Sequence, residues 1–265
     1  MASDIWTDIT GGVARLRFNR PEARNPLTMT GVAQVIDFLR AVESTPGLRC
    51  LAISGAGDHF MAGGDFDNFT SGLARPEAQI AADFEQKALD QIPIWTTLER
   101  LDIPVVCSVR GYAVGGALSF VAGADLAIAS QTACFILGHV KMGLPPDAAT
   151  TYFLPRAVGA RRAKQIAFFG DRLLAEEARE LGLVNWVVPD DKLEEKTEEV
   201  IARLASGPTL AIAEGRRLIN DSLQSSISEQ LTAEAQALAR CSTSHDMREG
   251  VAAMVEKRKA AFRGS

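Results

Sequence analysis

Apolar and polar residues in the first third of the chain repeat with two different periods. In VARLRF (13–18) they alternate one by one, which is the pattern of a half-buried strand. Residues 30–44 instead repeat apolar side chains at helical spacing, namely Val32, Val35, Ile36, Leu39 and Val42. The apolar run CLAISG (50–55) is short enough for a buried strand and ends in a glycine-rich turn. These patterns predict a strand, a helix and a second strand, in that order.

The middle of the chain continues this alternation. Residues 77–100 are expected to form a helix that is interrupted at Pro93. PVVCSV (104–109) is a further buried-strand candidate, and a turn and a helix rich in small residues follow it. Two more strand candidates, LAIAS and TACFI, lie within residues 126–136. Strands and helices that alternate along the chain predict an α/β fold with a largely parallel sheet.

After about residue 147 the pattern becomes mostly helical. A single strand candidate, VNWVV (184–188), lies among the helical segments, and no low-complexity linker separates the two halves. We predict an α/β core over residues 1–200 and a C-terminal helical lobe over residues 201–265.

The composition is that of an ordinary globular protein. Of the 265 residues, 47% are apolar and 23% are charged, and the net charge of −5 offers no general attraction to nucleic acid or to an anionic membrane. We expect no signal peptide and find no apolar span of about 18 residues, so the cytoplasm is the expected location. The four cysteines lie far apart, which favours buried free thiols, and no Cys or His cluster suggests a metal.

Two glycine-rich turns follow predicted strands, HFMAGGDFDNF (59–69) and GYAVGGA (111–117). Ligands of open α/β sheets bind at the carboxyl ends of the strands, and glycine lets the backbone approach a ligand closely. Two N–H groups from two such turns can converge on one oxygen atom, which is the construction of an oxyanion hole. Neither turn has the spacing of a nucleotide-phosphate loop.

Five motifs in order resemble the enoyl-CoA hydratase/isomerase (crotonase) family: NRPEARNPL, AGGDF, GYAVGGAL, EEARELGLVNWVVP and EGVAAMVEKRKAAF. The resemblance runs from about residue 5 to 263. It implies a spiral of repeated ββα units and a C-terminal helical lobe that serves in trimerisation, with trimers often paired into hexamers. It also implies acyl-coenzyme A thioester substrates and no metal or redox cofactor.

The resemblance further assigns site residues. The oxyanion donors would be the backbone N–H groups of Gly64 and Gly116. Lys257 would reach a CoA phosphate, on its own or a neighbouring subunit. The residues implied to hold coenzyme A or the acyl group are Ala23, Arg24, Ala62, Asp65, Phe66, Ser119, Met142 and Lys257. The acyl pocket is expected within residues 67–100, including Phe69, Phe84, Ile92 and Trp95.

The hydratases of this family resemble one another in two catalytic glutamates, and this chain has Ser119 and His139 at those positions. Hydration needs one group that activates water and one that delivers a proton, and serine cannot replace a carboxylate near neutral pH. The sequence therefore departs from the hydratase pattern. Ser119 either orients a polar group or makes a local hydrogen bond within its helix. Of the other histidines, His59 and His245 are interpreted as structural.

Asp147, in GLPPDAATT, has two interpretations. It is placed to be the N-cap of a following helix. Family members that lack the glutamate pair resemble this chain in an acid at this turn, where it moves a proton or, in the dehalogenases, attacks the substrate. Displacement of a halide is disfavoured, because the histidine and tryptophan that accompany it would fall near Ile92 and at His139.

The expected reaction is a proton shift in an enoyl-CoA, with Asp147 as base and acid and His139 as helper. Enoyl-CoA hydration by a divergent site remains open, and so does hydrolysis or C–C cleavage of a β-oxo substrate with water activated by His139. A CoA-binding oligomer without catalysis is a further alternative. An RNA-binding homologue is disfavoured by the net charge of −5.

Overall fold

The computed structural model describes residues 3–64 and 75–265. Its main sheet has six strands in the order β1-β2-β3-β4-β6-β9. β1 pairs antiparallel with β2, and the other neighbours pair in parallel. The strands are β1 (Ile5–Thr10), β2 (Val13–Phe18), β3 (Cys50–Gly55), β4 (Val105–Val109), β6 (Leu126–Ser130) and β9 (Trp186–Val188).

A second sheet has three short strands in the order β5-β7-β8: β5 (Tyr112–Val114), β7 (Cys134–Ile136) and β8 (Leu173–Leu174). β5 and β7 are parallel, and β7 and β8 are antiparallel. Along the chain, β5 directly follows β4 and β7 directly follows β6. The sequence patterns predicted β2, β3, β4, β6, β7 and β9, whereas β1, β5 and β8 were missed because each is short or largely exposed.

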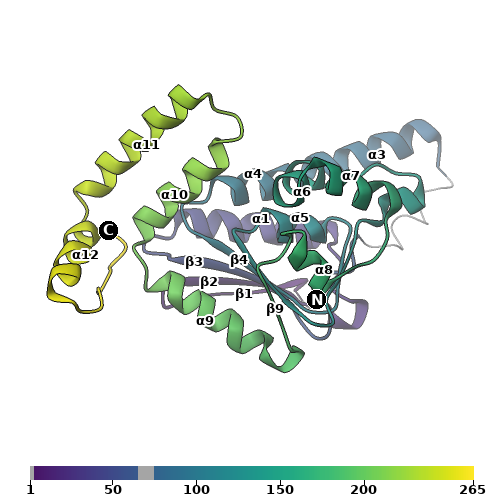
Figure 1. Cartoon of the computed structure of the whole chain (residues 1–265). Coiled ribbons are helices and arrows are strands. Elements are labelled where there is room, and N and C mark those ends of the chain that lie inside the picture. The colour runs from purple at the N-terminus through teal and green to yellow at the C-terminus, as the bar shows by residue number, and fades with distance from the viewer. Residues whose placement is uncertain (1–2, 65–74) are drawn as a thin grey trace.

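Helices cover both faces of the main sheet (Figure 1). Residues of β2 contact helices on opposite faces of the sheet. Val13 packs with the α9 residues Leu193 and Val200, whereas Ala14 and Leu16 face the large core on the other side. Because both faces are covered, the central strands β3, β4 and β6 are almost continuously apolar. The helices on the large-core side are α1 (Met29–Ser44), α4 (Ile92–Arg100), α5 (Ala117–Gly123), α6 (Thr150–Val158), α7 (Ala160–Phe169) and α8 (Ala175–Glu180); α9 (Leu193–Ala205) lies on the other side.

The helix predicted over residues 77–100 is interrupted as expected. α3 (Glu77–Asp90) ends at Gln91, and Pro93 lies in the first turn of α4, where its missing N–H costs nothing. α3 buries none of its residues and extends away from the sheet in Figure 1. Three 3₁₀ helices complete the body: η1 (Pro21–Ala23), η2 (Gly138–Met142) and η3 (Asp190–Lys192).

The C-terminal helices α10 (Thr209–Asp221), α11 (Ile227–Ser242) and α12 (His245–Glu256) project from the layered body (Figure 1). The predicted boundary at residue 200 falls inside α9, which packs on β3, β4 and β6 and so belongs to the body. The change from body to lobe instead comes at residues 206–208, where α9 ends and α10 begins.

Arg216 anchors the lobe to the body. Its side chain is 6% exposed, and its Nε donates to Asp125 Oδ2 at 2.8 Å. The remaining guanidinium nitrogens donate to the carbonyls of Leu98, Glu99 and Leu101 at the end of α4, at 2.6 to 2.9 Å. These four hydrogen bonds satisfy most of the buried guanidinium, and they fix where α10 leaves the body.

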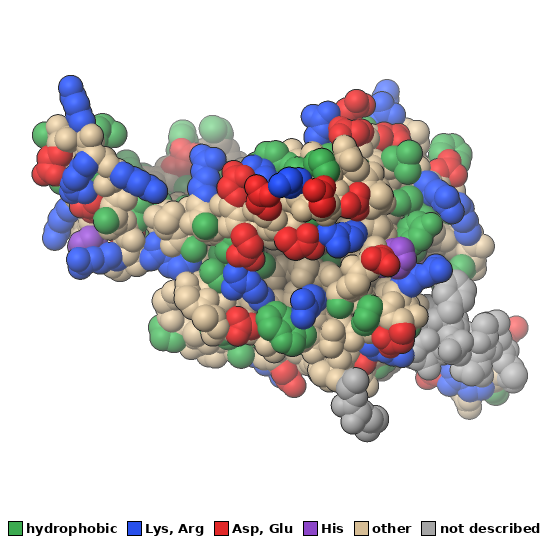
Figure 2. All heavy atoms as spheres, turned by 90° about the horizontal axis from the view of Figure 1, so that it is seen from below, with side chains coloured by type: hydrophobic (Ala, Val, Ile, Leu, Met, Phe, Trp, Pro, Cys, Tyr) green, Lys and Arg blue, Asp and Glu red, His purple; other side chains and the backbone are tan. Residues whose placement is uncertain are grey.

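Cys50, Cys107 and Cys134 are buried free thiols, as predicted. Burial raises the pKa of the Cys50 thiol to about 12, so it stays protonated and unreactive. No helix within the described ranges is long and apolar enough to cross a membrane. Figure 2 shows acidic and basic side chains interspersed on one face, without a continuous basic surface there.

Candidate active site

The two glycine turns lie against each other. The Val114 N–H donates to the Met61 carbonyl at 2.9 Å, and Met61 forms an isolated parallel bridge with Ala113. Gly63 and Gly115 both have left-handed backbone, with φ of +92° and +61°. A Cβ on Gly115 would lie 3.9 Å from the Cα of Gly63. The two turns therefore adjoin, as an oxyanion hole built from both of them requires.

The N–H groups of Gly64 and Gly116 are available as donors on these turns. In the described ranges, neither N–H donates to a backbone carbonyl in the loops and turns, although Leu27 bonds the Gly63 carbonyl at 3.0 Å and Gly115 bonds the Ile136 carbonyl at 2.8 Å. Two free N–H groups on adjoining turns are what an oxyanion hole requires. Their assignment as the oxyanion donors stays a prediction.

His139 and Asp147 are in direct contact. His139 Nε2 lies 3.0 Å from Asp147 Oδ1, and the imidazole is 11% exposed while the carboxylate is 51% exposed. η2 ends at the left-handed Gly143, where the chain turns back and brings Asp147 to the ring. Because a carboxylate oxygen only accepts hydrogen bonds, Nε2 carries the proton in this contact. The carboxylate keeps its second oxygen, Oδ2, for other chemistry.

This pair adjoins the second glycine turn. A Cβ on Gly115 would lie 3.6 Å from Cε1 and 3.8 Å from Nε2 of His139. A Cβ on Gly116 would lie 3.1 Å from the methyl carbon of Ala148, the residue after Asp147. A side chain on Gly115 would be in van der Waals contact with the His139 ring, and one on Gly116 would be tight against Ala148. The structure thus brings together Gly116, His139 and Asp147, which the family resemblance had assigned to the site.

The N-cap interpretation of Asp147 is wrong. α6 begins at Thr150, and its cap residue is Ala149, whose backbone is left-handed at φ 60°. Ala148 is left-handed as well, at φ 50°. Two consecutive left-handed alanines turn the chain so that the Asp147 carboxylate faces His139, while only its main-chain carbonyl bonds Thr150, through both N–H and hydroxyl. The Asp147 side chain is therefore held by His139 and does not cap α6.

The local hydrogen bond considered for Ser119 is also absent. Ser119 is 1% exposed on the first turn of α5, and its hydroxyl has no partner among the described residues. Nδ1 of His139 is likewise buried without a partner in the described part of the chain. Buried polar atoms without partners are rare in native structures.

The NRPEARN turn is held against the loop after β3, including the first glycine turn. The Ala62 N–H donates to the Arg24 carbonyl at 2.9 Å, which places Ala23, Arg24 and Ala62 together as predicted for one binding surface. Asn25, which sequence reasoning missed, fixes this arrangement. It is 1% exposed, accepts from the Arg20 N–H and donates to the carbonyls of Ala56 and His59 at 2.7 to 2.9 Å. The only signal that could have identified Asn25 was its position in the otherwise exposed, polar NRPEARN turn.

The other predicted residues lie farther from His139 and Asp147 or are not among the described residues. Asp65, Phe66 and Phe69 lie outside the described residues. Met142 is 43% exposed at the end of η2. Lys257 is the left-handed C-cap of α12, a helix at the opposite end of the molecule from α3 in Figure 1. Within one chain, Lys257 is therefore remote, and its proposed contact with CoA requires a neighbouring subunit.

The acyl pocket expected within residues 67–100 lies partly outside the described residues and stays a prediction. Ile92 is 48% exposed, whereas Trp95 is 6% exposed and packs its ring 4.7 Å from that of Phe120. The remaining histidines have structural contacts: His59 Nδ1 accepts from the Tyr112 N–H at 3.3 Å, and His245 lies 3.4 Å from Asp246.

Two cavities lie away from this centre. One of about 600 Å³ lies between the end of α5, α6 and α10. The other, of about 430 Å³, lies beside His59 and β5. Neither is lined by the glycine donors, His139 or Asp147. Across residues 3–64 and 75–265, no three His, Cys, Asp or Glu side chains are grouped to hold a metal ion.

Comparison with known proteins agrees with this site. The sequence model of the enoyl-CoA hydratase/isomerase family matches residues 8–265. The chain is 33% identical over 264 residues to 1,2-epoxyphenylacetyl-CoA isomerase of Escherichia coli K12, with 100% of both chains covered. It is 34% identical over 251 residues to crotonyl-CoA hydratase of Syntrophomonas wolfei, with 94% of both covered.

A solved structure shares the fold over nearly the whole length. This Mycobacterium abscessus structure, described as an enoyl-CoA hydratase/isomerase, superposes with a TM-score of 0.92 at 31% identity and covers 98% of this chain and 100% of its own. The ordered motifs, the adjoining glycine turns and these similarities agree. The chain belongs to the enoyl-CoA hydratase/isomerase (crotonase) family and has the crotonase fold.

Proposed function

We propose that the protein is an enoyl-CoA isomerase in which Asp147 moves a proton between two carbons of the acyl group. The observation that carries this proposal is the contact between His139 Nε2 and Asp147 Oδ1 beside the second glycine turn. A relative named as an isomerase of a CoA thioester, 1,2-epoxyphenylacetyl-CoA isomerase of Escherichia coli, supports an isomerase acting on CoA thioesters.

The reaction begins when Asp147 Oδ2 removes a proton next to the thioester or at the γ carbon. The electron pair of the broken C–H bond moves toward the thioester oxygen, which becomes an enolate oxygen. The N–H groups of Gly64 and Gly116 stabilise this charge, and a donor of this kind contributes about 3–4 kcal/mol. The protonated Asp147 then returns the same proton to the other carbon, so no water is added.

His139 orients the base. Its Nε2–H occupies Asp147 Oδ1, which leaves Oδ2 turned toward substrate. An enolate held by two backbone N–H groups requires less basicity to form, so a carboxylate is a sufficient base.

The substitution Asp147→Asn tests this mechanism directly. Asparagine keeps an oxygen that can accept from His139 Nε2, and the structure shows no helix cap to lose. Turnover should therefore fall by at least roughly 10²-fold while the fold and affinity for CoA remain. The matched control is Asp37→Asn, an acid that is 75% exposed on α1. A rate within a few-fold of wild type would exclude Asp147 as the base.

Hydration is the second candidate, because a relative at 34% identity is named a hydratase. Mass spectrometry of acyl-CoA products separates the two reactions. Isomerisation leaves the mass unchanged and exchanges α or γ hydrogens with solvent deuterium, whereas hydration adds one water. If His139→Ala abolishes activity and Asp147→Asn does not, His139 is the base, and hydration or hydrolysis becomes the better description.

We further propose that the enzyme is cytoplasmic, has no bound cofactor and acts on acyl-CoA thioesters. The thioester carbonyl oxygen would accept hydrogen bonds from the backbone N–H groups of Gly64 and Gly116. Calorimetry with acetyl-CoA and with free acetate tests this, since only the thioester carries the CoA portion. Equal affinity for both would contradict it.

A further inference from the structure

The segment that follows α12 is irregular in backbone but is held in place. Residues 258–265 form neither helix nor strand, and such a segment after the last helix of a domain is commonly poorly ordered unless other groups bind it. Here Arg258 donates to both carboxylate oxygens of Glu249 on α12, at 2.6 and 2.9 Å. The Ala261 N–H donates to the same carboxylate at 2.7 Å. A Cβ on Gly250 would lie 3.4 Å from the Phe262 ring, so the segment runs back along one face of α12.

The segment ends on the buried carboxylate of Asp246, in the first turn of α12. Asp246 is 3% exposed, and a charge this deeply buried requires hydrogen-bond partners. Its Oδ1 accepts from the Arg263 N–H at 2.6 Å, and its Oδ2 accepts from the Gly264 N–H at 2.7 Å. The Asp246 N–H donates in turn to the Ser265 carbonyl at 3.0 Å. Because Ser244 already caps α12, the Asp246 carboxylate binds residues 263–264 and does not cap the helix.

The same end of the segment contacts the body at Arg49, just before β3. Arg49 Nη2 donates to the Gly207 carbonyl at 2.6 Å, at the junction between α9 and α10. Gly264 packs against this guanidinium, since a Cβ on it would lie 2.6 Å from Arg49 Nη1 and 2.9 Å from Cζ. The backbone of Gly264 is also left-handed, at φ +83°, which favours glycine. Residues 258–265 thus join α12 to the body at the point where the lobe begins.

We propose that residues 258–265 are a strap that holds α12 against the body, and that the strap and α12 open together as one unit while the body stays folded. Two carboxylates of α12, those of Glu249 and Asp246, join the strap to the helix, so the two segments support each other. Arg216 anchors α10 independently of the strap. A unit of this kind opens at a lower free energy than the whole protein. While it is closed, the strap fixes the direction in which the exposed Met254 and Val255 of α12 point.

Hydrogen exchange of the full-length protein tests this proposal, read by mass spectrometry on peptides from residues 258–265, α12 and β3 and corrected for intrinsic rates. Residues 258–265 should exchange at least roughly tenfold more slowly than an unstructured peptide, because hydrogen bonds to a charged acceptor are among the stronger ones. Asp246→Asn leaves one side-chain oxygen for two N–H donors. Protection of residues 258–265 and of α12 should therefore fall together by about tenfold, and protection of β3 should not change.

Gly264→Ala tests the contact with the body and leaves both carboxylates in place. Its methyl group would collide with Arg49 Nη1, so we expect the same joint loss of protection in residues 258–265 and α12. Gly11→Ala is the matched control, because Gly11 has φ +62° and no atom lies within 4 Å of its Cβ position. Asp37→Asn, at a side chain that is 75% exposed on α1, is the control for Asp246→Asn. Neither control should change the exchange of the strap.

Three results would overturn the proposal. One is a wild-type strap that exchanges at the rate of an unstructured peptide. Another is a strap that loses protection in Asp246→Asn or Gly264→Ala while α12 keeps it, since the two would then not form one unit. The third is an equal loss in β3, which would show that the whole protein is destabilised. Exchange needs no substrate, so these outcomes are independent of whether Asp147→Asn stops isomerisation.

Discussion

At the scale of single residues, the turn at Ala148 and Ala149 is the least expected feature of the site. Alanine rarely adopts left-handed backbone, which costs about 1–2 kcal/mol per residue. Here two alanines do so in succession, at φ 50° and 60°. Residues held in sparsely populated conformations are concentrated at active sites. The strain is retained because this turn directs Asp147 to His139 instead of into a helix cap.

Ala149→Gly is therefore expected to leave the free energy of unfolding unchanged or to raise it by up to about 1 kcal/mol. Glycine removes the left-handed strain of about 1–2 kcal/mol and costs about 0.5–1 kcal/mol in chain entropy. We also expect kcat to fall, because a freer turn holds Asp147 less well. Urea unfolding and steady-state kinetics measure the two effects.

Ala202→Gly is the matched control for this substitution. Ala202 is an exposed alanine inside α9, where glycine should cost about 1 kcal/mol. Equal destabilisation by both changes would show that the Ala149 turn carries no strain.

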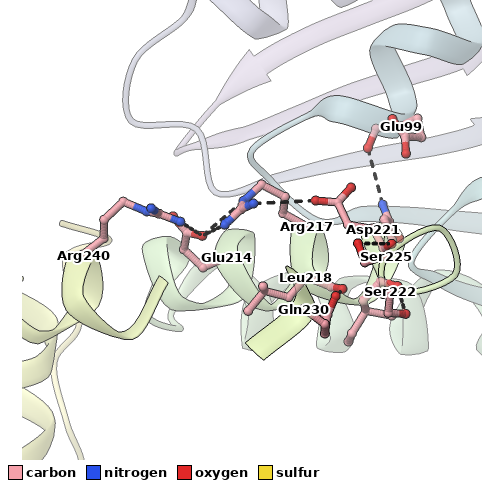
Figure 3. A network of polar contacts seen from close by, with 11 residues as sticks. Glu99, Glu214, Arg217, Leu218, Asp221, Ser222, Ser225, Gln230 and Arg240 are labelled. Carbon is pink, nitrogen blue, oxygen red and sulfur yellow. Dashed lines mark hydrogen bonds and ion pairs between the residues drawn. The ribbon is translucent and has the colours of Figure 1, made fainter. Parts of the chain in front are cut away.

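At the scale of elements, a network of charges joins α10 to α11 (Figure 3). Glu214 on α10 accepts from Arg240 of α11 at 2.6 and 2.8 Å and from Arg217 at 2.8 Å, and its side chain is 14% exposed. The hydrogen bonds from Arg240, and then those from Arg217, lower the pKa of Glu214 from 4.5 to about 2. The carboxylate therefore stabilises the packing of α11 on α10 only while it is charged.

This network predicts that the lobe is sensitive to acid. The pKa of Glu214 is about 2 in the folded lobe and near 4.5 once the contact is lost, so the folded lobe binds fewer protons in this range. Its contribution to stability is complete above about pH 4.5 and is lost progressively as the pH falls from 4.5 to 2. Hydrogen exchange of α10 and α11, corrected for intrinsic rates, should show protection falling across this window.

Glu214→Gln should flatten that pH dependence, because glutamine does not titrate. Glu234→Gln, at an exposed position on α11, is the control and should keep the wild-type profile. A Glu214→Gln variant with an unchanged profile would refute the assignment of this window to Glu214.

At the scale of the whole molecule, the lobe leaves apolar side chains without cover in a single chain. Leu238 on α11 and Met254 and Val255 on α12 are 73%, 80% and 77% exposed. These helices project from the body in Figure 1. Exposed apolar groups at this density mark a protein interface. We propose a trimer or a dimer of trimers, in which these helices pack against neighbouring subunits.

Met254→Glu should dissociate the oligomer by placing a charge in that interface. Leu89→Glu is the control, since Leu89 is 48% exposed on α3, outside the lobe. Sedimentation at micromolar concentration measures both variants. A wild-type protein that sediments as a stable monomer would contradict the proposal and would also remove Lys257 from the CoA site.

Much of the architecture could be predicted from the sequence because it depends on local periodicity. The alternation of apolar residues in β2 and their helical spacing in α1 determine which face of each element is buried, wherever that element lies in the fold. The glycine turns were predictable for the same reason, since left-handed backbone at Gly63 and Gly115 strongly favours glycine. β1 and β5 escaped prediction because pairing with neighbours, and not their own pattern, makes them strands.

The sequence by itself determined the fold class, the two converging turns and the candidates His139 and Asp147. Only the tertiary structure decided what Asp147 does, because local propensity favours a helix cap there and the packed chain overrides it with two left-handed alanines. The same holds for Asn25, whose hydrogen-bond partners Ala56 and His59 are distant in sequence. A hydrogen bond depends on distance in space, and spacing along the chain constrains that distance only within one element.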